Sequence, residues 1–101
     1  MDRSDMLHLI TTTYVKDSIG QQVPVEQSTP VFCAVQSISA AEFSSAGQLG
    51  LKPEYRFVLF AYDYSGQTLV EYRGVRYSVY RTYLAGNEQI ELYCERKAGT
   101  V

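Results

Sequence analysis

The strongest constraint on the fold is the alternation of apolar and polar side chains along residues 68–95. Two turn signals, Arg73-Gly74 and Gly86-Asn87, divide this stretch into three segments of strand-like composition. Successive side chains of a strand point to opposite faces. Two-residue loops at these turns place one set of side chains on a single face: Thr68, Val70, Tyr72, Val75, Tyr77, Val79, Arg81, Tyr83, Ile90, Leu92 and Cys94. The stretch therefore predicts a three-stranded antiparallel meander with one apolar face.

The same register predicts the neighbours on the opposite, outer face. Three cross-strand pairs follow: Glu71 with Arg76, Thr82 with Glu91, and Tyr80 with Tyr93. Arg81 is the exception, because strict alternation directs its charged side chain inward. Two explanations remain open: a bulge turns Arg81 outward, or its stem packs on the end of the fold while the guanidinium finds a carboxylate.

Three further strands are expected before the meander. Residues 7–15 predict the first, and residues 17–20 carry a turn signal. Residues 21–29 are polar and are expected to form an arm or a loose edge, since Pro24 and Pro30 disfavour regular pairing. Residues 31–38 predict the second strand, with Val31, Cys33 and Val35 on one face, and residues 55–62 predict the third. That third segment is apolar on both faces, which indicates a central strand or one covered by another element.

The segment between the second and third strands has a helix signal at its start. Ser39 and Glu42 have the spacing of a capping box, which predicts a short helix from Ala40 to about Gly47. Residues 39–53 are expected to be the most mobile part of the chain, because their composition is weak for an isolated helix. As an ordinary connection, the segment would instead pack Phe43, Leu49 and Leu51 on the body of the fold.

Six strands and one short helix predict an all-β fold, a small antiparallel β-barrel that hides its sheet edges. The 101 residues correspond to a single domain, with a frayed tail at about 97–101.

Composition excludes several classes of function. The net charge of −2 gives no field that would draw the whole molecule to nucleic acid. No run of 18 apolar residues predicts a membrane span, and the N-terminal residues have no apolar signal segment. Cys33 and Cys94 lack metal-ligand spacing and are expected as two thiols, bridged only if their strands are neighbours. His8 is the only histidine, and no nucleophile or phosphate-binding motif occurs, so we expect no enzyme, cofactor or metal site.

One alternative is a barrel that binds single-stranded nucleic acid. Arginines and tyrosines interleave in the meander, and Arg76, Tyr80 and Tyr93 share its predicted outer face. Glu91 and Glu95 on that face would repel phosphate. We therefore favour a structural role for these side chains, with Arg76 paired to Glu71 and the tyrosines packed across strands.

The meander also resembles a known family. Residues 71–83 (EYRGVRYSVYRTY) and 89–95 (QIELYCE) are similar to the C-terminal half of small head closure proteins of tailed bacteriophages, also called head–tail joining or stopper proteins. The rest of the chain resembles the family more loosely. The resemblance implies a small β-barrel with a long excursion between its second and third strands.

In that family the excursion faces the channel through which DNA passes. By position, the closure loop would comprise Ser39, Ala40, Ala41, Glu42, Phe43, Ser44, Ser45, Ala46, Gly47, Gln48, Leu49, Gly50, Leu51 and Lys52. A partner-docking surface is predicted at Gln21, Gln22, Val23, Arg76, Tyr80, Arg81 and Tyr93.

The resemblance implies a structural neck protein, assembled in the host cytoplasm and carried in the virion. Its partners would be the portal or connector (adaptor) protein above, a tail completion protein below, further copies of itself in a ring, and packaged double-stranded DNA. No membrane and no small-molecule substrate is implied. Another neck component, such as a tail completion protein, remains the alternative within the same class.

Overall fold

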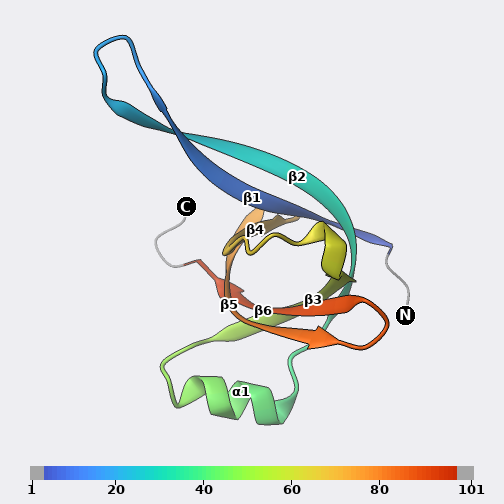
Figure 1. Ribbon diagram of the computed structural model, residues 1–101. Coiled ribbons are helices and arrows are strands. Elements are labelled where there is room, and N and C mark those ends of the chain that lie inside the picture. Colours follow the sequence, from blue (N-terminus) through green and yellow to red (C-terminus); the bar gives the residue numbers. More distant parts are fainter. Residues whose placement is uncertain (1–3, 98–101) are drawn as a thin grey trace.

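The computed structural model describes residues 4–97, which form a closed antiparallel β-barrel with one helix outside it (Figure 1). The elements are β1 (Asp5–Lys16), β2 (Gln22–Gln36), α1 (Ala40–Gly47), β3 (Pro53–Phe60), the 3₁₀ turn η1 (Ala61–Asp63), β4 (Leu69–Tyr72), β5 (Val75–Ala85) and β6 (Gln89–Arg96). Around the barrel the strand order is β1-β2-β3-β6-β5-β4. The predicted six-stranded barrel with a short helix between its second and third strands is confirmed.

The interior of the barrel is filled by one face of each strand. The core consists of Leu7, Leu9, Val31, Cys33, Phe57, Leu59, Val70, Tyr72, Tyr77, Leu92 and Cys94. Four aromatic rings meet edge-on at its centre, with the Phe57 and Tyr72 centroids 5.3 Å apart. The meander residues predicted to face inward on β4 and the start of β5 therefore do line the core.

The first meander turn has the predicted register. Tyr72 lies opposite Val75 and Val70 opposite Tyr77 across the Arg73-Gly74 loop. Arg73 has a φ of 51° and Gly74 a φ of 79°, and positive φ at both positions is what a type I′ two-residue hairpin loop requires. Glycine adopts this conformation without steric cost, which explains why the sequence signal located the turn correctly.

The second turn differs from the prediction. Ala85 lies opposite Gln89, so the connection has three residues, and Asn87 and Glu88 have positive φ. The extra residue moves the partners by one: the expected pairs Tyr80–Tyr93 and Thr82–Glu91 are wrong, and Arg81 lies opposite Tyr93. A bulge between Val79 and Arg81 then restores the expected pairing of Val79 with Cys94. This bulge turns Arg81 outward, as the first of the two explanations predicts.

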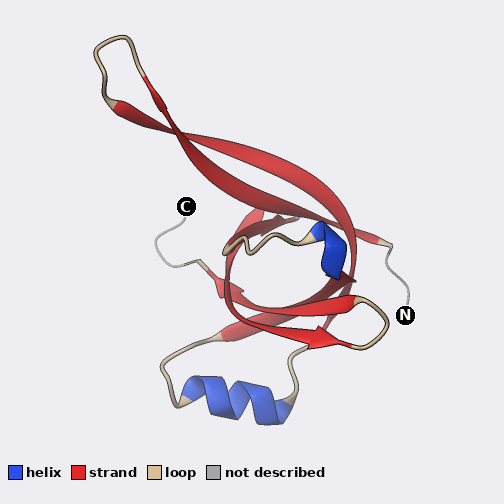
Figure 2. Cartoon of the chain, in the orientation of Figure 1, coloured by secondary structure: helices blue, strands red, loops and turns tan. Residues whose placement is uncertain are grey.

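The first hairpin is longer and more regular than predicted. β1 and β2 pair continuously from Asp5 opposite Cys33 to Lys16 opposite Gln22. Of the two alternatives for residues 21–29, the loose edge is therefore wrong and the arm is right: the distal hairpin projects beyond the barrel (Figures 1 and 2). Pro24 is accommodated because β3 pairs only with residues 34–36 of β2, which leaves the projecting part of β2 with β1 as its only paired neighbour.

Two strands end earlier than predicted. β3 ends at Phe60, because Ala61 and Tyr62 belong to the 3₁₀ turn instead of the predicted strand. β2 ends at Gln36, two residues before the predicted end of the second strand. The part of the predicted C-terminal tail after residue 97 lies outside the described residues.

Cys33 and Cys94 are both buried and free. They belong to β2 and β6, which β3 separates in the barrel order, so their strands are not neighbours. Burial raises the pKa of the Cys33 thiol to about 11 and that of Cys94 to about 12. Within residues 4–97, no helix has the length and apolarity needed to cross a membrane.

Candidate functional site

The excursion between β2 and β3 is organised by the N-terminus of α1. The Ser39 hydroxyl accepts a hydrogen bond from the Glu42 backbone N–H at 3.2 Å, as the capping-box spacing predicts. The Glu42 side chain reaches across to β5, where its carboxylate contacts two residues beside the bulge. The sequence pattern thus located the helix, but it did not reveal this contact of Glu42.

Glu42 clips α1 to the barrel. The Tyr80 hydroxyl donates a hydrogen bond to the Glu42 carboxylate at 2.8 Å, and Arg81 Nη2 donates one at 2.5 Å. The Arg81 guanidinium also lies 4.0 Å from the centroid of the Tyr93 ring, a cation–π contact. We call these four side chains, Glu42, Tyr80, Arg81 and Tyr93, the clip.

The electrostatics of the clip favour a charged carboxylate. The hydrogen bond from Arg81 lowers the pKa of Glu42 below its ordinary value, and the bond from Tyr80 adds to this effect. Burial raises the pKa of Tyr80, and its hydrogen bond to Glu42 raises it further. At neutral pH the clip is therefore an ionised carboxylate held by a guanidinium and a neutral phenol.

The outer face of β3 is covered where α1 lies. Val58 is fully buried although it alternates with the core residues Phe57 and Leu59. Ala34 of β2 and Ala46 of α1 are buried as well, and Ala34 lies opposite Val58. The expectation that a strand apolar on both faces is covered by another element is confirmed for this part of β3.

The rest of the excursion leaves apolar side chains in solvent. Phe43 is 55% exposed and Leu49 is 79% exposed, while Leu51 is half-buried. The expectation that all three pack on the barrel is therefore wrong for Phe43 and Leu49. Between α1 and β5 there is a hollow of about 420 Å³, lined by Glu42, Ser45, Ala46, Leu49, Leu51, Tyr80 and Arg81. The excursion thus offers an apolar surface beside a charged clip.

Arg76 lies in a different cluster. Its guanidinium donates two hydrogen bonds of 2.8 Å to the Glu26 carboxylate on β2 and one of 3.3 Å to Glu71 on β4. These bonds with Arg76 lower the pKa of Glu26. The predicted Glu71–Arg76 pair is confirmed. No sequence pattern indicated the Glu26 contact, because nothing local relates a residue of the arm to β5.

The predicted docking residues therefore divide into three places. Tyr80, Arg81 and Tyr93 join the excursion in the clip, and Arg76 binds Glu26 and Glu71. Gln21, Gln22 and Val23 lie at the end of the arm, away from α1 (Figure 1). The Tyr80 and Tyr93 rings lie 6.4 Å apart, and Arg81 covers Tyr93, so these rings pack on protein and do not form an open platform for bases.

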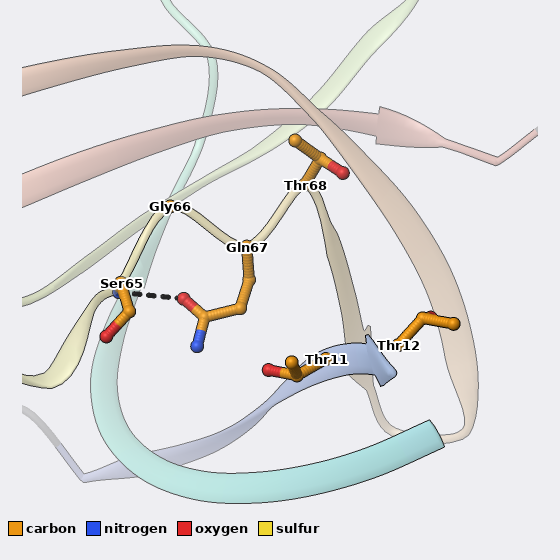
Figure 3. A pocket seen from close by; sticks show the side chains of 6 residues that line it. All are labelled: Thr11, Thr12, Ser65, Gly66, Gln67 and Thr68. Carbon is orange, nitrogen blue, oxygen red and sulfur yellow. Dashed lines mark hydrogen bonds between the residues drawn. The ribbon is translucent and has the colours of Figure 1, made fainter. Parts of the chain in front are cut away.

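A second hollow, of about 340 Å³, is polar (Figure 3). It is lined by Thr11, Thr12, Ser65, Gly66, Gln67 and Thr68. Its wall is partly organised by Gln67, whose side-chain oxygen accepts a hydrogen bond of 2.8 Å from the Ser65 backbone N–H. This hollow lies where the chain approaching β4 diverges from β1. No cluster of three His, Cys, Asp or Glu side chains suited to a metal ion occurs between residues 4 and 97.

These features define the class of protein as a small closed β-barrel that carries a projecting hairpin and an external helix. No family model matches the chain, and no curated protein matches its sequence. Among solved structures, it is similar to the solution structure of protein SF1141 from Shigella flexneri 2a, a structural genomics target. The TM-score is 0.73 at 17% identity, over 95% of this chain and 94% of that one. At this identity the likeness establishes a shared fold alone.

Proposed function

We propose that this chain is a structural protein of the neck of a tailed bacteriophage. It docks on the portal or connector after DNA packaging, closes the head channel and provides the platform for the tail. The observation that carries the proposal is the excursion between β2 and β3, residues 39–52, which is clipped to the barrel through Glu42 and exposes Phe43 and Leu49. The resemblance of the meander to head closure proteins implies a channel-facing segment at this position.

The distribution of exposed apolar residues supports an assembly role. Outside the excursion, large apolar side chains are exposed on the arm, where Tyr14 is 64% and Ile19 is 75% exposed, and also at Tyr62 (79%) and Leu84 (70%). A barrel closes its own sheet edges, so strand pairing with other proteins is available only through such projections. In this proposal the arm and the excursion contact the connector above, a tail completion protein below and neighbouring copies in a ring, while the excursion faces packaged double-stranded DNA.

The test is complementation of phage particles assembled without this protein, followed by electron microscopy. Head closure predicts capsids that leak DNA and lack tails, and both defects are corrected by the purified protein. Capsids that retain DNA but lack tails would instead assign the chain to tail completion. Normal infectious particles would contradict any neck function.

Two variants test whether the excursion is the closing segment. Particles complemented with the double variant Phe43→Ser, Leu49→Ser should attach tails poorly. They should release DNA at least ten times faster than particles complemented with the native protein. Tyr62→Ser is the matched control, because Tyr62 is 79% exposed and lies outside the excursion. Equal rescue by the double variant and the control would exclude the excursion as the closing segment.

A further inference from the structure

The projecting half of the β1–β2 hairpin has unpaired edges. β4 pairs with β1 only at residues 8–10, and β3 pairs with β2 only at residues 34–36. Beyond these points each strand of the arm has one paired neighbour in the described structure, namely the other strand of the arm. An unpaired edge presents a row of free N–H and C=O groups and is a template for another strand.

The two edges of the arm differ in their hydrogen-bonding capacity. At the end of the hairpin the Asp17 N–H donates to the Gln21 carbonyl at 2.9 Å. The direction of the backbone N–H and C=O groups alternates along a strand. Those of the odd-numbered residues of β1 and β2 therefore bond within the hairpin, and those of the even-numbered residues point away from it, in the plane of the sheet. On β2 two of the outward positions are Pro24 and Pro30, which have no N–H. The β2 edge is therefore protected against pairing.

The β1 edge has no such protection. Its outward positions beyond the reach of β4 are Thr12, Tyr14 and Lys16, each with a backbone donor and acceptor and each exposed. We propose that this edge pairs with the same edge of a second copy of the chain. The two β1 strands run antiparallel about a two-fold axis that passes between the two Tyr14 residues.

The register follows from the count of available groups. With Tyr14 opposite its counterpart, Thr12 of each copy faces Lys16 of the other, and all three outward residues of both strands form hydrogen bonds. A shift by two residues in either direction leaves only two of these residues paired. One of those shifts would also require the outer edge of Ile10, which already pairs with Leu69.

In this register the even-numbered side chains form polar rows. Even-numbered residues share one face of the arm, and on β2 Glu26 lies opposite Thr12. Lys16 of the second copy would therefore stand beside Thr12 and two strand spacings from Glu26, whose carboxylate Arg76 already binds. The two Tyr14 rings would meet at the axis, each next to Pro24 of its own hairpin.

The other face of the joined arms would be apolar. Thr13 lies opposite Val25 and Val15 opposite Val23 within one hairpin. Pairing places Val15 of the second copy beside Thr13, so each row across the four strands consists of valine and threonine. These are the residue types with the highest β propensity, which suits them to a four-stranded sheet.

Space for the second strand exists at the base of the arm. The polar hollow beside Thr11 and Thr12 lies where the chain before β4 turns away from β1 (Figure 3). The distal end of the second arm would enter there. The contact is smaller than a standard stable interface, which takes about 20–30 residues from each partner. The dimer is therefore expected to form at high concentration and to dissociate on dilution. This inference does not depend on the proposed neck function.

The first test is sedimentation equilibrium of the purified full chain over a wide concentration range. Tyr14→Pro removes an outward N–H while leaving the bonds within the hairpin intact, and should weaken dimerisation by about tenfold or more. Ser28→Pro is the matched control, because it makes the same change on the already protected β2 edge. Equal weakening by both variants, a native chain that stays monomeric, or self-association that survives Tyr14→Pro would overturn the proposal.

A second test is independent of proline strain. Directly opposite residues in a hydrogen-bonded antiparallel pair have Cα atoms about 5.5 Å apart, which lies within the range that a disulfide can bridge. Under mild oxidation Tyr14→Cys should give a covalent dimer at least ten times faster than Gln22→Cys, whose side chain would lie three strand spacings from its counterpart. The native thiols do not compete, because Cys33 and Cys94 are buried. Equal rates for the two variants would contradict pairing through β1.

Discussion

The two halves of the β1–β2 hairpin have the same pairing but different surroundings. Inside the barrel, Leu9 and Val31 are 0% and 8% exposed. Further along the same face, beyond the barrel, Val15 is 50% and Val23 is 39% exposed. The alternation of side chains therefore specifies the strands in both halves, whereas burial, and with it most of the free energy of folding, comes only from closure of the barrel.

The largest difference is expected between two identical substitutions on β2. Val31→Ala removes buried methyl groups and should lower the free energy of unfolding by about 2 kcal/mol, counting transfer and cavity terms. Val23→Ala, on the same face of the arm, should change it by less than about 0.5 kcal/mol. Chemical denaturation monitored by tyrosine fluorescence measures both values. Similar losses would show that the arm shares in the cooperative core.

Two glycine turns give the next largest contrast. Gly74, between β4 and β5, has a φ of 79°, and Gly20, in the turn of the arm, has a φ of 85°. Alanine at either position imposes a similar local cost of about 1 kcal/mol, since a side chain disfavours positive φ. Gly74→Ala should lower the global stability by that amount, whereas Gly20→Ala should leave the thermal midpoint nearly unchanged because the arm can fray locally. Equal shifts in the midpoint would argue against an independent arm.

A third contrast concerns how α1 is held. Glu42→Gln weakens the clip to Arg81, so amide exchange of residues 40–47 should become several-fold faster while global stability falls by at most about 1 kcal/mol. Glu54→Gln, which weakens an exposed ion pair with Arg96 at 3.4 Å, is the control and should not affect α1. Unchanged exchange in Glu42→Gln would mean that packing of Ala46 alone holds the helix.

The smallest effect is expected at the base of the arm. The hydrogen bonds with Arg76 lower the pKa of Glu26 below 4.5, so the pair stabilises the folded arm above that pH, and this contribution is lost as the pH falls through the lowered pKa. Glu26→Gln should speed amide exchange of the arm at pH 7. The ratio of variant to native exchange rates should approach 1 well below pH 4.5. A ratio independent of pH would exclude ionic anchoring of the arm by Glu26.

The sequence predicted local pairing better than chain connections. The Arg73-Gly74 turn fixed the β4–β5 register, because a two-residue loop leaves one choice of partners. At the next turn, the glycine at Gly86 suggested a two-residue loop, yet Asn87 and Glu88 adopt the positive φ values. The bulge near Tyr80 compensates for the extra residue, so the predicted core of β6 was right even though the partners near the turn were wrong.

Contacts between distant segments were beyond sequence reasoning. The capping box located α1 because Ser39 and Glu42 interact within one turn. The partners of the Glu42 carboxylate depend on where β5 passes the helix, which no local pattern encodes. The same holds for Glu26 and Arg76, which lie in different hairpins. The prolines of β2 misled the prediction because their effect depends on which edge is open, and only the assembled barrel defines that.

Barrel closure has a kinetic consequence. The hairpins β1–β2, β4–β5 and β5–β6 connect strands that are adjacent in the chain and form on the microsecond scale. The seam between β1 and β4 joins His8 to Glu71, so it requires a much longer loop to close and is expected to form late. During synthesis, β1 has no partner at this seam until β4 has left the ribosome, and the barrel cannot close until β6 has followed. The rate at which that seam forms, more than the rate of strand formation, would set how long a nascent chain stays exposed to aggregation.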